Sequence, residues 1–231
     1  MSSPEDGALS PHSRRPHFAR FAHSAFERFC RLVFRLRCPL QHFGRENLPP
    51  PPFLICANHC SHMDTPALMT AGGGTFDNYA MIAARDYFFS GGSGGGGKFG
   101  YHRFMFLVPV ERRASRDSLR AMFDGCRPHL DAGRCLIIYP EGTRSVDGNI
   151  GAMKRGAAAL ALGLKVPVVP AHIGGTFHCL PKGALLPKGG KVSVRFGKAL
   201  MPADYPQSRN ASRQLAADIS AAILQLSEQG Q

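Results

Sequence analysis

The sequence predicts an α/β fold, with a largely parallel central sheet flanked by helices and a basic amphipathic helix at the N-terminus. Short apolar segments alternate with segments of helical spacing through most of the chain, and this alternation is typical of βαβ units. The length of 231 residues and the 44% share of hydrophobic residues suit one domain with a substantial core. General disorder is excluded on the same grounds.

The N-terminal region divides into a tail and an amphipathic segment. Residues 1–16 are polar, so we expect a disordered tail and no secretory signal. In residues 17–38 apolar side chains recur at helical spacing, and arginines fill much of the remaining surface. This segment is either a helix packed on the core or a helix lying on an anionic membrane. The many phenylalanines and arginines favour the membrane helix, which Pro39 is expected to end.

Residues 39–231 are predicted to form a single folded domain. After a proline-rich linker at 48–52, short apolar runs predict strands at 53–57, 79–84, 105–110, 135–139 and 166–173, and the alternation of apolar and polar residues predicts one at 192–196. Helical spacing predicts helices at 61–71, 115–132, 154–164 and 211–228. Pro128 is expected to kink the second of these helices or to end it early. The glycine-rich stretch at 90–97 is expected to be a loop.

The composition limits the partners that the chain can have. Lys and Arg outnumber Asp and Glu by 28 to 16, which gives a net charge of +12. Such a charge indicates nucleic acid, an anionic lipid surface or a phosphorylated substrate. No nucleic-acid-binding motif is present, so we expect no nucleic acid partner. Seven scattered cysteines without a CxxC pair indicate a reducing compartment, and no apolar run is long enough to span a membrane.

The first segment with chemical information is 58–64, Asn-His-Cys-Ser-His-Met-Asp, which lies between a predicted buried strand and a predicted helix. Open α/β folds bind ligands at such positions. If the turn is tight, Asp64 orients the imidazole of His59 and leaves its other nitrogen free to accept a proton. Other interpretations are a helix cap with ordinary polar histidines, a metal site of His59, His62 and Asp64, or a nucleophilic Cys60.

The second such segment is 139–145, Tyr-Pro-Glu-Gly-Thr-Arg-Ser, which also follows a predicted buried strand. Gly142 lets backbone amides approach a ligand, while Thr143 and Arg144 offer a hydroxyl and a planar cation suited to phosphate. Lys154 stands near the start of the next predicted helix, whose N-terminus also favours an anion. A turn of this composition is usually only a turn, but beside the first segment it indicates half of an active site.

Together these segments resemble the glycerolipid acyltransferase family, typified by 1-acylglycerol-3-phosphate acyltransferases. Four motifs of the family appear in order: NHxxxxD at 58–64, (I/V)-(D/N)-R at 110–112, (F/Y)PEGTRS at 139–145 and V-P-(I/V)-(I/V)-P at 166–170. The resemblance covers roughly residues 40–200. The chain departs from the family at Glu111, where Asp or Asn is usual, and at 90–97, where many members have an apolar segment.

The resemblance implies an acyltransferase domain over residues 39–231. Such a domain moves a fatty acyl group from acyl-CoA or acyl carrier protein to the free hydroxyl of a lysolipid, with 1-acylglycerol 3-phosphate as the first choice of acceptor. His59 is then the general base and Asp64 the residue that orients it, and no metal, cofactor or acyl-enzyme is needed. The residues expected to bind the substrate, chiefly its phosphate, are Asn58, Arg112, Glu141, Gly142, Thr143, Arg144 and Lys154.

Two alternatives stay open at this point. The acceptor can be a lyso-ornithine or another amino-acid lysolipid, whose carboxylate would meet the same arginines. The chain can also be a non-catalytic lipid-binding protein that keeps the fold. If the chain is an acyltransferase, with either acceptor, its positive charge would favour binding to an anionic membrane surface. We therefore expect the protein on the cytoplasmic face of a membrane, as a peripheral or monotopic protein.

Overall fold

The computed structural model describes residues 17–85, 105–111, 115–181, 184, 186–206, 208 and 210–230, with the backbone alone for residues 17–20 and 116. The expected tail at 1–16 and the glycine-rich stretch at 90–97 lie outside these residues.

A seven-stranded sheet forms the centre of the molecule, with the strand order β1-β7-β6-β2-β5-β3-β4. Every neighbouring pair is parallel except β6 and β7, so the predicted largely parallel sheet is confirmed. The strands are β1 (Leu40–Phe43), β2 (Leu54–Ala57), β3 (Tyr79–Ala84), β4 (Phe106–Val110), β5 (Cys135–Ile138), β6 (Val168–Gly174) and β7 (Val192–Phe196).

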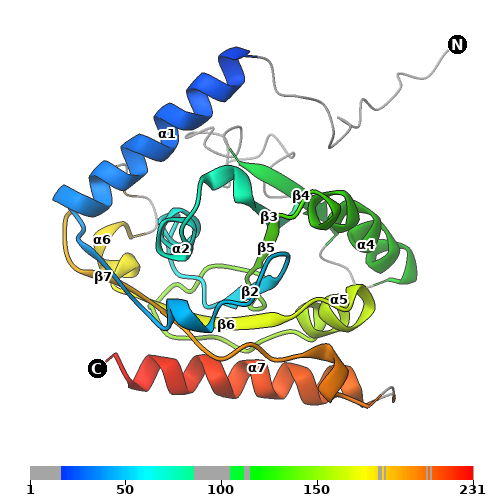
Figure 1. The fold of residues 1–231 in the computed structure, drawn as a ribbon. Coiled ribbons are helices and arrows are strands. Elements are labelled where there is room, and N and C mark those ends of the chain that lie inside the picture. The colour runs from blue at the N-terminus through cyan, green and yellow to red at the C-terminus, as the bar shows by residue number, and fades with distance from the viewer. Residues whose placement is uncertain are drawn as a thin grey trace, which may run out of the picture.

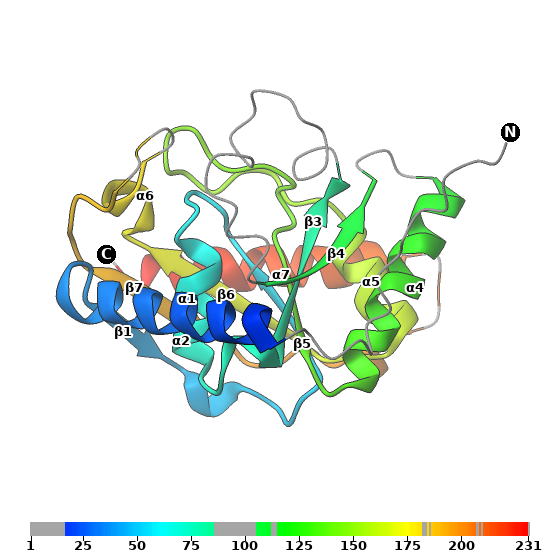
Figure 2. The ribbon, with the colours of Figure 1, turned by 90° about the horizontal axis from the view of Figure 1, so that it is seen from above.

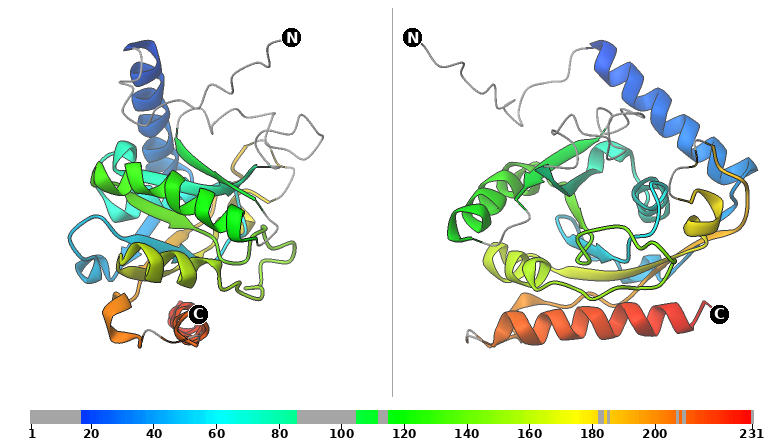
Figure 3. Two further views of the ribbon diagram at one scale, coloured as in Figure 1. Left: turned by 90° about the vertical axis from the view of Figure 1, so that its right-hand side faces the viewer. Right: turned by 180° about the vertical axis from the view of Figure 1, so that it is seen from behind.

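Helices cover both faces of this sheet, as the alternation of strands and helices predicts. They are α1 (His17–Leu36), α2 (Asp64–Gly72), α4 (Arg116–Asp131), α5 (Gly156–Leu164), α6 (Thr176–Cys179) and α7 (Ala211–Glu228). Short 3₁₀ turns stand at Arg45–Asn47, Phe76–Asn78 and Pro202–Asp204. Figure 1 shows α1 and α7 on opposite sides of the molecule, with α2 between α1 and the sheet. The view from behind in Figure 3 repeats this arrangement.

Two hydrophobic clusters fill the space between the sheet and its helices. One lies on the α2 side and includes Leu68, Phe76 and Ile137, all of them fully buried. The other lies on the α5 and α7 side and includes Leu160 and Ile219. Strands buried on both faces read as continuous apolar runs, which is why β2 and β5 were recognisable from the sequence.

The inner face of α1 is fixed to the loop that follows α2. The carboxylate of Glu27 accepts hydrogen bonds from Nε of Arg31 at 2.9 Å and from the backbone N–H of Phe76 at 3.0 Å. Arg31 also donates to the carbonyl of Gly74 at 2.7 Å, and Phe26 meets the ring of Phe76 edge-on at 6.3 Å. The predicted N-terminal helix therefore exists, and one of its faces packs on the domain.

Several element boundaries differ from the expected ones. Pro128 does not end α4, which continues to Asp131, because a proline in the last turn removes a single N–H and Ala132 still donates to the Pro128 carbonyl. The short edge strand β1 was not predicted, and neither was α6. Helix α2 begins at Asp64 rather than at residue 61, because the preceding amides bond to the Asp64 side chain instead of continuing a helix.

The carboxyl ends of the parallel strands meet at one edge of the sheet. Figure 2 shows the arrowheads of β3 and β4 at this edge, with α6 and the loop between β5 and α5 beside it. The pairing of Cys56 with Ile138 brings the segment after β2 next to the segment after β5. Both motif segments from the sequence thus lie at the edge where open α/β folds bind ligands.

Candidate active site

The imidazole of His59 contacts the carboxylate of Asp64 at this edge. Nδ1 of His59 lies 2.8 Å from Oδ2 of Asp64. Because an ionised carboxylate can only accept hydrogen bonds, Nδ1 carries a proton and Nε2 is left as the basic nitrogen. The His59 side chain is 20% exposed whereas that of Asp64 is fully buried. The pair is therefore a partly exposed imidazole held by a carboxylate that solvent cannot reach.

The carboxylate of Asp64 organises the whole turn before α2. Its Oδ2 atom also accepts hydrogen bonds from the backbone N–H groups of Cys60 and Ser61, at 2.7 and 2.8 Å. Its Oδ1 atom accepts a hydrogen bond of 2.6 Å from the hydroxyl of Thr176, at the start of α6. The turn is tight because one buried carboxylate collects its N–H groups, and this brings residue 59 within reach of residue 64.

Glu141 connects the two motif segments through its side chain. Oε1 accepts the backbone N–H of His59 at 2.7 Å, and Oε2 accepts the backbone N–H of Gly151 at 2.9 Å. The residue is 7% exposed, and burial raises the pKa of its carboxyl, although the two backbone hydrogen bonds partly oppose this. The carboxylate of Glu141 thus holds the backbone of His59 and of the loop in position, and the substrate-binding role expected for this residue stays a prediction.

An aromatic ring lies against one face of the imidazole of His59. The rings of His59 and Tyr139 stack with centroids 3.9 Å apart and an interplanar angle of 11°. The hydroxyl of Tyr139 lies 2.8 Å from the hydroxyl of Thr65 on α2. Tyr139 directly follows β5, so the same sheet edge that supplies Glu141 also supplies this ring.

Asn58 occupies a structural position between two strands. Its side-chain amide donates to the carbonyl of Ile173 at 3.0 Å, and its side-chain oxygen accepts the N–H of Ile173 at 2.7 Å. The residue is 4% exposed. Asn58 ties the end of β2 to β6, which holds the neighbouring His59 in place, and the substrate-binding role expected for Asn58 stays a prediction.

The turn at 141–144 lies next to the backbone of His59. Gly142 has a φ of +74°, and a Cβ added there would lie 2.7 Å from Nζ of Lys154. The turn thus needs glycine, and the lysine ammonium lies over it. The N–H of Lys154 donates to the carbonyl of Pro140 at 2.9 Å, and Ser145 donates its N–H to the carbonyl of His59 at 2.7 Å.

The remaining expected substrate-binding residues differ in their position. Thr143 is exposed and Arg144 is half-buried. Arg144 lies near enough to His62 to disfavour its charge, and burial together with Arg144 and His59 lowers the pKa of His62 to about 4. Arg112 lies outside the described residues, so its predicted role stays a prediction.

The alternative chemistries for the first segment find little support. Burial and the charge of Asp64 raise the pKa of the Cys60 thiol to about 12, and its Sγ lies against the hydroxyl of Thr176 at 3.2 Å. A thiol of this kind is not an activated nucleophile. Among the described residues, no three His, Cys, Asp or Glu side chains form a group that could hold a metal ion.

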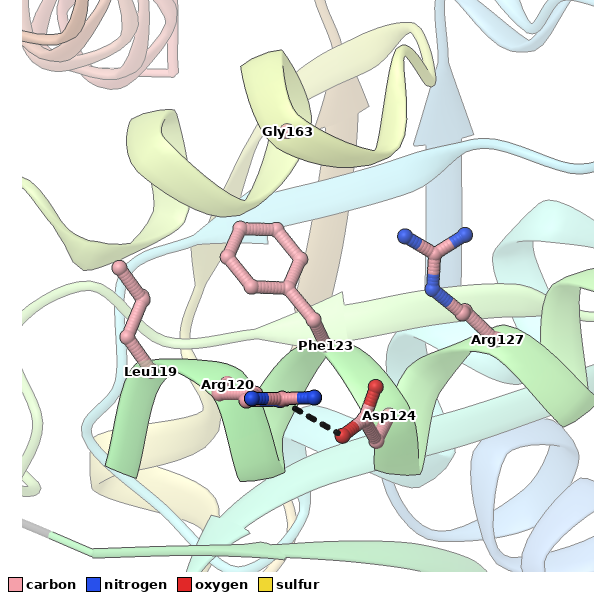
Figure 4. A pocket seen from close by; sticks show the side chains of 6 residues that line it. All are labelled: Leu119, Arg120, Phe123, Asp124, Arg127 and Gly163. Atoms are coloured by element: carbon pink, nitrogen blue, oxygen red, sulfur yellow. Dashed lines mark ion pairs between the residues drawn. The ribbon is translucent and has the colours of Figure 1, made fainter. Parts of the chain in front are cut away.

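A separate groove lies between α4 and α5, away from the residues of the site. It has a volume of about 510 Å³ and is lined by Leu119, Arg120, Phe123, Asp124, Arg127 and Gly163 (Figure 4). Figure 4 also shows the exposed ion pair between Arg120 and Asp124, 4.0 Å apart. None of these residues belongs to the motif segments.

Two residues of the site were not recognised from the sequence. Thr176 bonds to Asp64 across 112 positions of the chain, and no local pattern around it points to a histidine–carboxylate pair. Tyr139 was read only as part of a motif, although an aromatic residue at the end of a strand beside a histidine could have suggested stacking. Both roles depend on which strands are neighbours.

Comparison with known proteins connects this chain to one family. The family model described as Acyltransferase matches residues 40–174. A 1-acyl-sn-glycerol-3-phosphate acyltransferase of Chlamydomonas reinhardtii is 32% identical over 192 residues, which cover 75% of this chain and 51% of the relative. A protein of the same name from Pseudomonas aeruginosa is 28% identical over 68% of this chain and 57% of its own length.

A solved structure agrees with these matches. The crystal structure of the 1-acyl-sn-glycerophosphate acyltransferase from Thermotoga maritima superposes with a TM-score of 0.66 and 27% identity. The match covers 95% of this chain and 85% of that one. The chain spans about half the length of its algal relative.

Proposed function

Since the chain belongs to the glycerolipid acyltransferase family, we propose that it transfers a fatty acyl group from an acyl thioester to the free hydroxyl of a lysolipid. The observation that carries this proposal is the His59–Asp64 pair at 2.8 Å, beside the glycine turn at 141–144. The relatives are named for 1-acyl-sn-glycerol 3-phosphate, which makes this lysolipid the first acceptor to test. The product would be phosphatidic acid, and the donor would be acyl-CoA or acyl carrier protein.

In this reaction His59 acts as the general base. Its Nε2 atom takes the proton of the acceptor hydroxyl as the oxygen attacks the thioester carbonyl. The carbon–sulfur bond then breaks, and the departing thiolate takes the proton back from the imidazolium. Asp64 stabilises the protonated ring and keeps Nδ1 bonded, so the basic nitrogen stays directed at the substrate.

The acceptor's phosphate would bind at the turn that follows β5. Gly142 opens the backbone there, and the ammonium of Lys154 lies over it. Arg144 adds a planar cation and Thr143 an exposed hydroxyl, both suited to phosphate oxygens. Arg112 completes this set by its place in the second motif. Glu141 and Asn58 support the site from beneath rather than bind the anion, because their polar atoms already bond to the backbone.

The outer face of α1 would hold the protein on the membrane. Phe21, Phe29, Leu32 and Leu36 are between 53% and 72% exposed, and residues at this spacing share one face of a helix. The arginines at 28 and 35 are exposed on the same helix. Aromatic and aliphatic side chains flanked by arginines are the composition of helices that lie in an anionic lipid interface.

We propose that the protein is attached to the cytoplasmic face of a membrane by the outer face of α1. All seven cysteines are free and buried, which suits a reducing compartment. None of the helices in the part of the chain that the structure describes is long and apolar enough to cross a membrane.

The function is tested by measuring acyl transfer from acyl-CoA and from acyl carrier protein to a panel of lysolipids in detergent. We expect transfer to 1-acylglycerol 3-phosphate, and a loss of about 10²–10⁴-fold in kcat for His59→Ala, because a positioned base contributes that much. His42→Ala is the matched control, since His42 is exposed on β1. Transfer to none of the lysolipids, or full turnover of a folded His59→Ala variant, contradicts the proposal; transfer to a lyso-ornithine lipid alone would reassign the acceptor.

A further inference from the structure

The ring of Tyr139 covers one face of the His59 imidazole. At a centroid distance of 3.9 Å and an interplanar angle of 11°, the two rings lie nearly parallel and in contact. Tyr139 is 8% exposed, so water is largely excluded from the stacked side. A charge that appears on the imidazole therefore meets an aromatic face there instead of solvent.

Buried polar contacts on the side of α2 hold this ring in place. The hydroxyl of Thr65 lies 2.8 Å from the hydroxyl of Tyr139 and 3.2 Å from Sδ of Met81. Thr65 and Met81 are both buried.

We propose that Tyr139 is a positioning residue that makes His59 a stronger base by stacking against its protonated form. This inference rests on the proposed function, in which His59 becomes positively charged in the transition state. The face of an aromatic ring carries negative electrostatic potential and attracts a cation within about 6 Å of its centre. Tyr139 thus favours the imidazolium over the neutral ring, and it also keeps the imidazole plane in the orientation that Asp64 requires.

Other charged groups also face His59, and the contribution of Tyr139 adds to theirs. Asp64 on α2 contacts Nδ1, and the Glu141 carboxylate accepts the backbone N–H of the same residue; both favour the imidazolium. His62 lies on the same turn and is kept neutral at pH 7 by burial and by Arg144, which lower its pKa to about 4. A change confined to the ring at position 139 leaves all of these groups in place.

The test replaces the electronic character of the ring without changing its shape. The full chain is made with Tyr139→Phe and with pentafluorophenylalanine at position 139, whose ring face is electron-poor. Protonation of His59 is followed by NMR in protein with labelled histidines, and its signal is identified by its absence in His59→Gln. We expect His59 in Tyr139→Phe to become protonated at nearly the same pH as in the parent. With the fluorinated ring, the midpoint of His59 protonation should shift to lower pH by about half a unit to one unit.

Kinetics distinguish this role from a purely structural one. In the fluorinated protein the acid limb of the pH profile of kcat should move to lower pH by the same amount as the NMR midpoint of His59. Relative to Tyr139→Phe, kcat should be lower and KM unchanged. Equal NMR midpoints for the two rings would overturn the proposal, as would an acid limb that stays fixed while kcat falls. Because the NMR titration needs no turnover, it decides about Tyr139 even if no lysolipid is accepted.

Discussion

Asp64 shows how a buried carboxylate depends on each of its donors. It is fully buried, and an ionised group in such a place is stable only when hydrogen bonds replace water. Three of its four short contacts come from within the turn that precedes α2, and the fourth comes from Thr176. The hydroxyl at 2.6 Å is the contact that ties the turn to α6.

Thr176→Val should therefore damage both stability and turnover. Valine keeps the shape but leaves Oδ1 of Asp64 without this donor, which costs about 1.5–3 kcal/mol in the free energy of unfolding. We expect kcat to fall at least about tenfold because the carboxylate that orients His59 shifts. Urea denaturation and acyl transfer assays measure the two effects.

Thr70→Val is the matched control for this change. The hydroxyl of Thr70 is buried on α2 without a hydrogen-bond partner, so its removal relieves an unsatisfied group. This variant should be as stable as the parent or slightly more stable, with normal kcat. If both valine variants behave alike, the bond from Thr176 to Asp64 has no special role.

At the scale of elements, α1 has two different faces. The inner face contains Glu27 and Arg31, which bond to the loop after α2, together with the buried Cys30 and Phe34. The outer face exposes phenylalanine and leucine. A helix that served only to cover the core would carry polar residues on its outer side, so the outer face indicates a second contact.

Phe29→Ser combined with Leu32→Ser should release the protein from anionic vesicles. Both side chains are more than half exposed, so the fold loses little, while membrane affinity should fall at least about tenfold because buried apolar area is lost. Cosedimentation with phosphatidylglycerol vesicles measures this. Leu224→Ser on α7, where the leucine is 46% exposed, is the control and should bind as the parent does. Unchanged binding of the double variant would leave α1 a purely structural helix.

At the scale of the whole molecule, burial affects the stability at low pH. Burial lowers the pKa of His62, His129 and His172 to about 4, helped by a nearby arginine in each case. Unfolded histidine titrates near pH 6.5. Between these values the unfolded chain binds protons that the native chain does not, so the free energy of unfolding decreases as the pH falls from about 6.5 to about 4.

His129→Gln should remove part of the decrease in unfolding free energy at low pH. His129 is the most buried of the three, at 7% exposure, and after allowance for partial solvation we expect its share to be about 1–2 kcal/mol between pH 7 and pH 4. The measurement is the difference in unfolding free energy between variant and parent at both pH values. His42→Gln, an exposed position, should show no such difference. If the unfolding free energy of His129→Gln differs from that of the parent by the same amount at both pH values, the protonation of His129 does not explain the loss of stability.

Most of the sheet could be predicted because its strands show either a continuous apolar run, as in β2 and β5, or the alternation seen in β7. The bounds of β3 and β7 match the expected ranges, and α7 matches residue for residue. The edge strand β1 was missed because three of its four residues are exposed, so it shows no apolar run. Its pairing with β7 rests on backbone hydrogen bonds, which no side-chain pattern records. The start of α2 was placed too early because the competing bonds from Asp64 are also invisible in the sequence.

The amino-acid sequence by itself determined the fold class and the two motif segments, which follow from local periodicity and from residue types at short spacing. The pairing of a histidine with a carboxylate five residues later was predicted on the condition of a tight turn and through the resemblance to a family. Only the tertiary structure decided that Glu141 and Asn58 bond to the backbone, that Thr176 completes the partners of Asp64 and that Tyr139 stacks on His59. Each of these contacts joins residues far apart in the chain, and the order of strands in the sheet brings them together.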